Sequence, residues 1–249
     1  MNKHVNSQYN VAAPDSLAIR VANFQRRRMY HRFLDATGIQ THETLFDVGV
    51  TSDQTYASSN YVEAWYPHKA RITSAGIDDA RFLERLHPGL RFVRADGLAI
   101  PFQNRSFDVV HSSAVLEHVG AFQNQVRFIA ECARVARKAA FLTTPNRWFP
   151  VEFHTSLPVV HWLPKTAFRT LMRRTGREFF AEETNLNLMS PTELRRAAKA
   201  ALDASEFWFE VETVALAGWP SNLLLIICRR DAHVERRLSG QGSQHGNGR

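Results

Sequence analysis

The sequence contains few cysteines, and their spacing shows no pairing. Its 249 residues include Cys132 and Cys228 alone, each within an apolar stretch. Disulfide frameworks and zinc sites use several cysteines at short, regular spacings. We therefore expect neither of them, and no metal site. Two isolated thiols in apolar surroundings instead predict buried, reduced cysteines and a reducing compartment.

Long apolar runs are also absent. No stretch approaches the roughly 18 apolar residues that a membrane span requires. Residues 1–8 are polar and lack the apolar core of a signal peptide. The sequence therefore predicts a cytoplasmic location.

Net positive charge is small in the middle of the chain, although the formal net charge of the whole is +7. Residues 1–37 hold six Lys and Arg against two Asp, and residues 231–249 hold three Arg against two acids. Nucleic-acid readers more often carry a basic stripe on the folded core, with aromatic residues between the charges. The distribution disfavours a nucleic-acid partner, and an RNA-modifying enzyme is kept as a minor alternative.

What the chain does contain is an alternation of short β-branched runs with helix-like segments, which predicts an α/β fold. Strands are expected at residues 44–48, 72–77, 91–94, 107–112, 139–144, 209–216 and 223–229, and helices at 60–66, 80–86, 121–135, 165–174 and 191–204. The connection between the last two strands is too short for a helical crossover. The fold class is thus a Rossmann-like, seven-stranded, mostly parallel sheet with an antiparallel C-terminal hairpin strand and helices on both faces.

The ends of the chain differ from this core. Residues 15–37 carry apolar residues before and after the basic run at 26–28, which predicts an amphipathic helix packed on the sheet or over the cofactor cleft, with peripheral membrane contact as the alternative. We expect residues 1–14 and the Gly/Gln/Ser-rich residues 231–249 to be disordered. Residues 15–230 then form one domain, with an insertion at residues 145–190.

Acidic residues follow the second and third predicted strands. In open α/β sheets, ligands bind outside the carboxyl ends of the strands. Asp78 lies where a carboxylate can accept hydrogen bonds from both hydroxyls of a ribose, and Asp79 is better suited to cap the next helix. Asp96, before Gly97, can accept from the exocyclic amine of adenine or simply form a turn.

The order of these residues resembles the class I S-adenosylmethionine-dependent methyltransferases, in particular a small-molecule branch with a short D-G-x-x-(L/I)-P-F motif. The matching stretches are LFDVGV, SAGIDD, RADGLAIPFQNRSFDVVHSSAVLEHV and KAAFLTTPNR, within residues 40–150. The resemblance implies S-adenosylmethionine as cofactor. It also implies these cofactor-binding residues: Asp47 and Gly49 in the first motif, Asp78 on the ribose, Asp96, Gly97 and Leu98 around the adenine, and Ser112 and Ser113 beside the methionine portion.

Two glycines of the family pattern D-x-G-x-G-x-G are missing, because Thr51 and Asp53 occupy their positions. A dinucleotide would suffer most from this change, since its pyrophosphate needs a glycine turn without negative charge. The cationic S-adenosylmethionine tolerates an acid or a hydroxyl there. The altered motif therefore argues against NAD more strongly than against methyl transfer. It also leaves open a relative that binds the cofactor without catalysis.

The connection after the fifth predicted strand is long and rich in proline, aromatic residues and histidine. Residues 148–164 show no sustained helical or strand period. Long loops in compact domains often cover a site, so this segment is expected to form a lid and acceptor wall, with a structural flap or a dimer contact as the rival interpretation. Glu152 and His154 are the candidate catalytic residues, and Asn146 and His118 are weaker candidates.

The sequence thus predicts methyl transfer to a small-molecule or lipid-like acceptor. The alternatives are a non-catalytic binding protein and an RNA methyltransferase.

Overall fold

One seven-stranded sheet organises the computed structural model of the protein, which describes residues 17–54, 59–152, 154–155 and 157–232. Its strands are β1 (Leu45–Val48), β2 (Ile72–Gly76), β3 (Arg91–Arg94), β4 (Phe107–Ser113), β5 (Ala136–Pro145), β6 (Phe207–Leu216) and β7 (Trp219–Arg229). The strand order is β3-β2-β1-β4-β5-β7-β6, with β1 to β5 parallel and β7 antiparallel to both of its neighbours. The predicted fold class is confirmed.

A tight hairpin turn joins β6 to β7. Ala217 and Gly218 both have positive φ angles, 49° and 82°, as the right-handed twist of a two-residue hairpin requires. The predicted antiparallel connection is confirmed, although β7 begins four residues before its expected start. Strand β6 forms the edge of the sheet, and β7 lies inside it.

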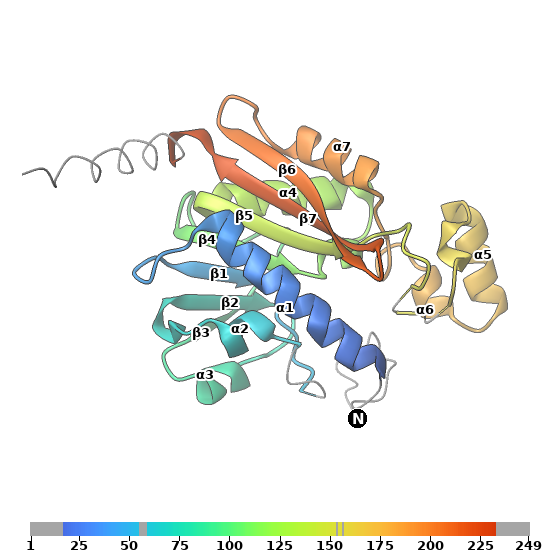
Figure 1. Ribbon diagram of the computed structural model, residues 1–249, viewed down its shortest axis with the longest axis horizontal. Coiled ribbons are helices and arrows are strands. Elements are labelled where there is room, and N and C mark those ends of the chain that lie inside the picture. Colours follow the sequence, from blue (N-terminus) through green and yellow to red (C-terminus); the bar gives the residue numbers. More distant parts are fainter. Residues whose placement is uncertain (1–16, 55–58, 153, 156, 233–249) are drawn as a thin grey trace, which may run out of the picture.

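Helices cover both faces of the sheet (Figure 1). Apolar residues of α1 (Leu17–Thr37), α2 (Tyr61–Trp65) and α3 (Phe82–Leu86) share one buried cluster with the sheet, and those of α4 (Phe122–Val135) and α7 (Pro191–Ala201) share another. Helix α7 starts as predicted: Ser190 accepts a hydrogen bond from the backbone N–H of Glu193 in a capping box, and Pro191 is the first helical residue. The central strands are therefore buried on both faces.

The chain between β5 and α7 builds a smaller unit at one end of the sheet. Helices α5 (Lys165–Arg174) and α6 (Glu178–Ala181) pack around a separate cluster of Phe168, Met172, Ala181, Leu186 and Leu188. Figure 1 shows this unit standing away from the main helical layers. Short 3-10 turns at Lys69–Arg71, Leu116–His118 and Val160–Trp162 complete the elements.

Helix α1 lies on the sheet, as one of its two predicted placements requires. Its Gln25 donates a hydrogen bond to Ser221 at 2.7 Å, and Arg32 forms an ion pair with Glu212 of β6. The guanidinium of Arg27 lies 5.0 Å from the ring centre of Trp65. Arg27 and Arg32 of this helix are therefore engaged in contacts within the molecule. No helix in the described ranges is both long enough and apolar enough to cross a membrane.

Two expectations about the ends and the thiols need correction. Cys132 is buried as predicted, but Cys228 is half-buried, because the sheet face around it is only partly covered. Asp231 and Ala232, in the segment expected to be disordered, have helical backbone. The rest of that tail, residues 1–14 and the first two residues of the predicted N-terminal helix lie outside the described residues.

Candidate functional site

The carboxyl ends of β1 to β4 lie at one edge of the sheet, because these strands are parallel neighbours. Gly49 follows β1 with φ of 101°, and a Cβ atom there would lie 2.1 Å from Cγ2 of Val115. Any side chain would therefore be strained and would clash with the segment after β4. The first motif glycine is thus needed for the close approach of two loops.

Asn60 closes the loop that lacks the later glycines. Its side-chain amide donates to the carbonyl of Thr51 at 3.0 Å, and its amide oxygen accepts from the N–H of Thr51 at 2.9 Å. The hydroxyl of Thr51 in turn accepts from the backbone N–H of Asp53. Side-chain hydrogen bonds thus fix the conformation of this loop, which in the family pattern contains further glycines. No local pattern in the sequence predicts this pairing of Asn60 with Thr51, nine residues earlier.

Asp78 lies at the same edge, just after β2, and is half-buried. Ser52, in the loop after β1, donates a hydrogen bond to its Oδ2 at 3.4 Å. The neighbouring Ile77 exposes 68% of its surface. An acid beside an exposed apolar side chain suits a nucleoside, which offers hydroxyls and a flat ring. The ribose role of Asp78 stays a prediction. Asp79 accepts from the backbone N–H of Arg81 just before α3, consistent with its structural role.

Asp96 shapes the turn after β3. Its Oδ1 accepts a hydrogen bond from the N–H of Leu98 at 2.8 Å, and its side chain is exposed. A Cβ atom on Gly97 would lie 2.4 Å from Cε2 of Phe128 in α4, so glycine is required there. The turn role of Asp96 is therefore present in the structure, and the adenine role of Asp96, Gly97 and Leu98 stays a prediction.

The two serines at the end of β4 differ in their surroundings. Ser112 is buried and donates to the carbonyl of Val48 at 2.8 Å, so its hydroxyl ties β4 to β1. Ser113 is half-buried and shares a hydrogen bond with Thr143 at 2.9 Å. Of the two, Ser113 is better placed beside a ligand at this edge.

Asp47 belongs to a buried polar network below the site. Nδ1 of His111 lies 2.7 Å from Oδ1 of Asp47, and Nε2 of the same ring lies 3.0 Å from the hydroxyl of Tyr61. Glu63 accepts from Ser74 at 2.6 Å. Burial raises the pKa of Asp47 to about 7 and that of Glu63 well above its usual value, and it lowers the pKa of His111 to about 4.

These pKa shifts favour neutral forms, with a hydrogen-bond chain from the Tyr61 hydroxyl through the imidazole to Asp47. The carboxyl group of Asp47 therefore faces the interior, and cofactor contact by this side chain stays a prediction. Sequence reasoning missed the network, because its members come from β1, α2, β2 and β4. The signal available was the number of polar residues within otherwise apolar strands.

The insertion after β5 reaches the same edge of the sheet through a second polar cluster. Glu152 is buried and accepts hydrogen bonds from the backbone N–H and Nδ1 of His154, the latter at 2.6 Å. The rings of His154 and His118 lie edge to face, with centroids 4.8 Å apart. Glu117, just before His118, is fully buried. The structure therefore joins the predicted pair Glu152 and His154 to residues that follow β4.

Burial and charge set the protonation of this cluster. Burial acts to raise the pKa of Glu152, but His154 and backbone N–H groups lower it to about 2. Burial acts to lower the pKa of His154, but the carboxylates of Glu152 and Glu117 raise it. Burial also raises the pKa of Glu117 to about 7 and lowers that of His118 to about 3. From the sequence, His118 is a weak candidate, and no pattern singles out Glu117.

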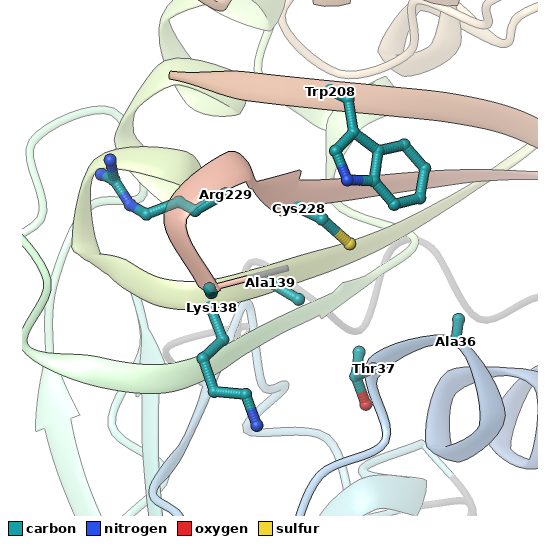
Figure 2. Close-up of a pocket in the computed structure, with 8 residues that line it drawn as sticks. Ala36, Thr37, Lys138, Ala139, Trp208, Cys228 and Arg229 are labelled. Atoms are coloured by element: carbon teal, nitrogen blue, oxygen red, sulfur yellow. The ribbon is translucent and has the colours of Figure 1, made fainter. Parts of the chain in front are cut away.

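A cavity of about 130 Å³ lies at the other end of the strands, away from the carboxyl ends of β1 to β4, where β5 begins and β7 ends (Figure 2). Its lining includes Thr37 at the end of α1, Lys138, Trp208 and Cys228. Pockets for small-molecule ligands usually measure about 300–1,000 Å³. This cavity is smaller, and it is remote from the carboxyl ends of the parallel strands. It is therefore a poor candidate for the cofactor site.

Comparisons with known proteins found similarity to methyltransferases. Residues 58–144 match a family model described as a methyltransferase domain. Over 119 residues the chain is 31% identical to phthiotriol/phenolphthiotriol dimycocerosates methyltransferase 1 of Mycobacterium ulcerans and 32% identical to its counterpart in Mycobacterium leprae. Each match covers 46% of this chain and 41% of the relative, so the chain spans about two fifths of the length of these relatives.

Solved structures share the fold at low sequence identity. Magnesium protoporphyrin IX methyltransferase of Synechocystis PCC 6803, solved with bound SAH, superposes with a TM-score of 0.55 at 12% identity, covering 90% of this chain and 92% of that one. The PH0226 protein of Pyrococcus horikoshii OT3 gives a TM-score of 0.55 at 14% identity, covering 91% and 97%. These likenesses support the fold alone.

Proposed function

We propose that the chain is a class I S-adenosylmethionine-dependent methyltransferase that transfers the methyl group of S-adenosylmethionine to a small-molecule or lipid-like acceptor, because residues 58–144 match a methyltransferase domain. One observation carries the proposal: Gly49, Asp78 and Asp96 follow β1, β2 and β3 at one edge of the sheet, inside or beside the matched methyltransferase domain. In this role Asp78 holds the ribose hydroxyls. Asp96 and Leu98 hold the adenine.

Methyl transfer proceeds directly from cofactor to acceptor, so the protein need not form a covalent bond to either. The acceptor atom bonds to the methyl carbon as the carbon–sulfur bond breaks, the sulfur keeps the electron pair, and S-adenosylhomocysteine leaves. Positioning the two reactants in line therefore supplies much of the rate. A hydroxyl acceptor must in addition lose its proton.

The insertion at residues 145–190 is proposed as the acceptor side. Within it, Trp148, Val151, Val159 and Leu163 each expose more than 40% of their surface, so an apolar wall faces outward. Glu152 is buried and His154 is half-buried, and the ring of His154 contacts that of His118, which follows β4. The mycobacterial relatives are named for phthiotriol and phenolphthiotriol substrates, which favours an apolar acceptor that carries hydroxyl groups.

Helix α1 offers little support for an RNA acceptor. Arg32 is paired with Glu212, Arg27 lies over Trp65, and Arg28 donates to the carbonyl of Ala215. A guanidinium that is already engaged has less to gain from a phosphate. Peripheral membrane contact through the exposed Phe24 and the cytoplasmic location stay predictions.

Isothermal titration of the full chain with S-adenosylmethionine and S-adenosylhomocysteine tests cofactor binding, and incorporation of a tritiated methyl group into hydroxylated lipid acceptors tests transfer. We expect saturable binding of both and labelling of an apolar acceptor. Binding without labelling of any acceptor would favour the non-catalytic alternative. Absence of binding to either compound by folded protein would contradict the proposed function.

A further inference from the structure

The cluster where the insertion meets β4 has the composition of a metal site. Glu117, His118 and His154 each place one ligand atom so that all three lie within 4.8 Å of one another. Two ligands held about 2.0–2.2 Å from one ion lie at most about 4.4 Å apart. The 3.8 Å between Nε2 of His118 and Oε1 of Glu117 already fits, and a small side-chain rotation would close the widest separation.

The carboxylate of Glu117 supplies a separate indication. Its Oε2 accepts a hydrogen bond from Thr144 at 2.8 Å, but its buried Oε1 accepts none from the described residues. A fully buried carboxylate oxygen without a hydrogen bond is costly. A cation that binds Oε1 would remove that cost.

The second atom of each proposed ligand is held by another group. Nδ1 of His118 donates to the carbonyl of Asn185 at 2.7 Å, and Nδ1 of His154 donates to Glu152. Metal-binding histidines usually donate their other N–H to a carbonyl or a carboxylate, which fixes the ring and makes the ligand nitrogen more basic. Nε2 is therefore the ring nitrogen that each histidine would offer to an ion.

We propose that Glu117, His118 and His154 bind a divalent transition-metal ion, with Glu152 orienting His154. Two imidazoles and one carboxylate suit Zn²⁺ or Mn²⁺ better than Ca²⁺, which prefers oxygen ligands alone. This site differs from the sequence-based expectation of no metal, which considered cysteine spacing. Its ligands are instead brought together from β4's end and the insertion, 36 residues apart along the chain.

The position of the site indicates what the ion does. Val115, two residues before Glu117, touches the Gly49 turn at the expected cofactor edge. An ion there would bind the acceptor's hydroxyl as an alkoxide or phenolate, whose proton is released to solvent on binding. The oxygen would then attack the methyl carbon. This role rests on the proposed methyl transfer, whereas binding of the ion does not.

The test measures metal directly. Full-length protein is stripped with a chelator, titrated with ZnCl₂ and MnCl₂ by calorimetry, and analysed for metal content after dialysis. We expect one ion per chain. The Kd should rise by about 100-fold in Glu117→Gln, which keeps the volume of the side chain, and by about 10–100-fold in Glu152→Gln, which removes a group that orients a ligand. The exposed His42→Ala variant is the matched control and should bind as the parent does.

Circular dichroism checks each variant, and where Glu117→Gln does not fold, His118→Ala and His154→Ala replace it. The proposal is overturned if the parent protein binds no ion, or if folded ligand variants bind as tightly as the parent. Cofactor titration in parallel separates the two proposals: metal binding without S-adenosylmethionine binding contradicts the proposed function alone, and the reverse result contradicts the metal site alone.

Discussion

The sheet half of the molecule, residues 45–144, and the insertion at residues 145–190 are built by different means. In the first, the strand ends are fixed by buried strands with helices on both faces, and glycines allow loops to touch. In the second, short helices enclose a small core of their own, and hydrogen bonds such as those of His118 with Asn185 and of Gln125 with Asn187 join the insertion to the sheet half. A sheet edge held by buried strands and an insertion with its own small core suit two separate tasks, namely holding a cofactor and selecting an acceptor.

The two regions should differ most in how much a glycine-to-alanine substitution lowers the free energy of unfolding. Gly49→Ala places a Cβ at a φ of 101° and 2.1 Å from Val115, so we expect the free energy of unfolding to fall by about 2–5 kcal/mol. Gly176→Ala in the insertion has φ of 72° but nothing within 4 Å, and should cost about 1–2 kcal/mol. Urea unfolding of both variants measures this difference. Equal losses of unfolding free energy in the two variants would show that the close approach of Gly49 to Val115 adds nothing to the cost of the substitution.

The same contrast explains what could be predicted from the sequence. The seven strands were predictable, since short runs such as residues 223–227 are apolar throughout and follow turn-forming residues such as Gly218. Helix α7 carried its own start signal in Ser190 and Pro191. Helix α6, with four residues, was missed because one turn has no period to detect.

Side-chain partners were harder to foresee than strands. The pairing of Glu117 with Thr144, and the approach of His154 to His118, depend on how an irregular segment folds back onto the sheet. No local pattern encodes such a contact. The candidates Glu152 and His154 were found from composition alone, and their partners were visible only in three dimensions.

Cofactor affinity should depend on the sheet half. Asp78→Ala removes an acceptor for two ribose hydroxyls, so we expect S-adenosylmethionine binding to weaken by about 1.5–3 kcal/mol. Asp79→Ala is the matched control, because that exposed neighbour is engaged with Arg81 and should leave affinity nearly unchanged. Calorimetry gives both values, and circular dichroism verifies the fold. Unchanged affinity in a native Asp78→Ala protein would refute the ribose assignment.

A smaller effect is expected at Asp96, where two roles can be separated. Asp96→Asn can keep its Oδ1 as the acceptor for the N–H of Leu98, but it turns the other oxygen into a donor that would face the exocyclic amine of adenine. We expect a loss of about 1–1.5 kcal/mol in cofactor affinity with the stability retained. Asp96→Ala should lose both affinity and stability. If Asp96→Asn binds the cofactor as the parent does, Asp96 serves the turn alone.

The smallest effect should arise on the apolar wall of the insertion. Leu163 exposes 41% of its surface, and Leu163→Ser would remove a modest apolar area from contact with a bound acceptor. We expect about 0.5–1 kcal/mol, seen as a few-fold rise in KM for a long-chain hydroxylated acceptor identified by tritium labelling. Because the cofactor edge belongs to the sheet half, S-adenosylmethionine affinity should not change. Leu86→Ser provides the matched control, since Leu86 is exposed by 63% on α3 of the sheet half. If both serine variants have the same acceptor KM as the parent, Leu163 does not contact the acceptor, and the structural-flap interpretation of residues 148–164 is favoured.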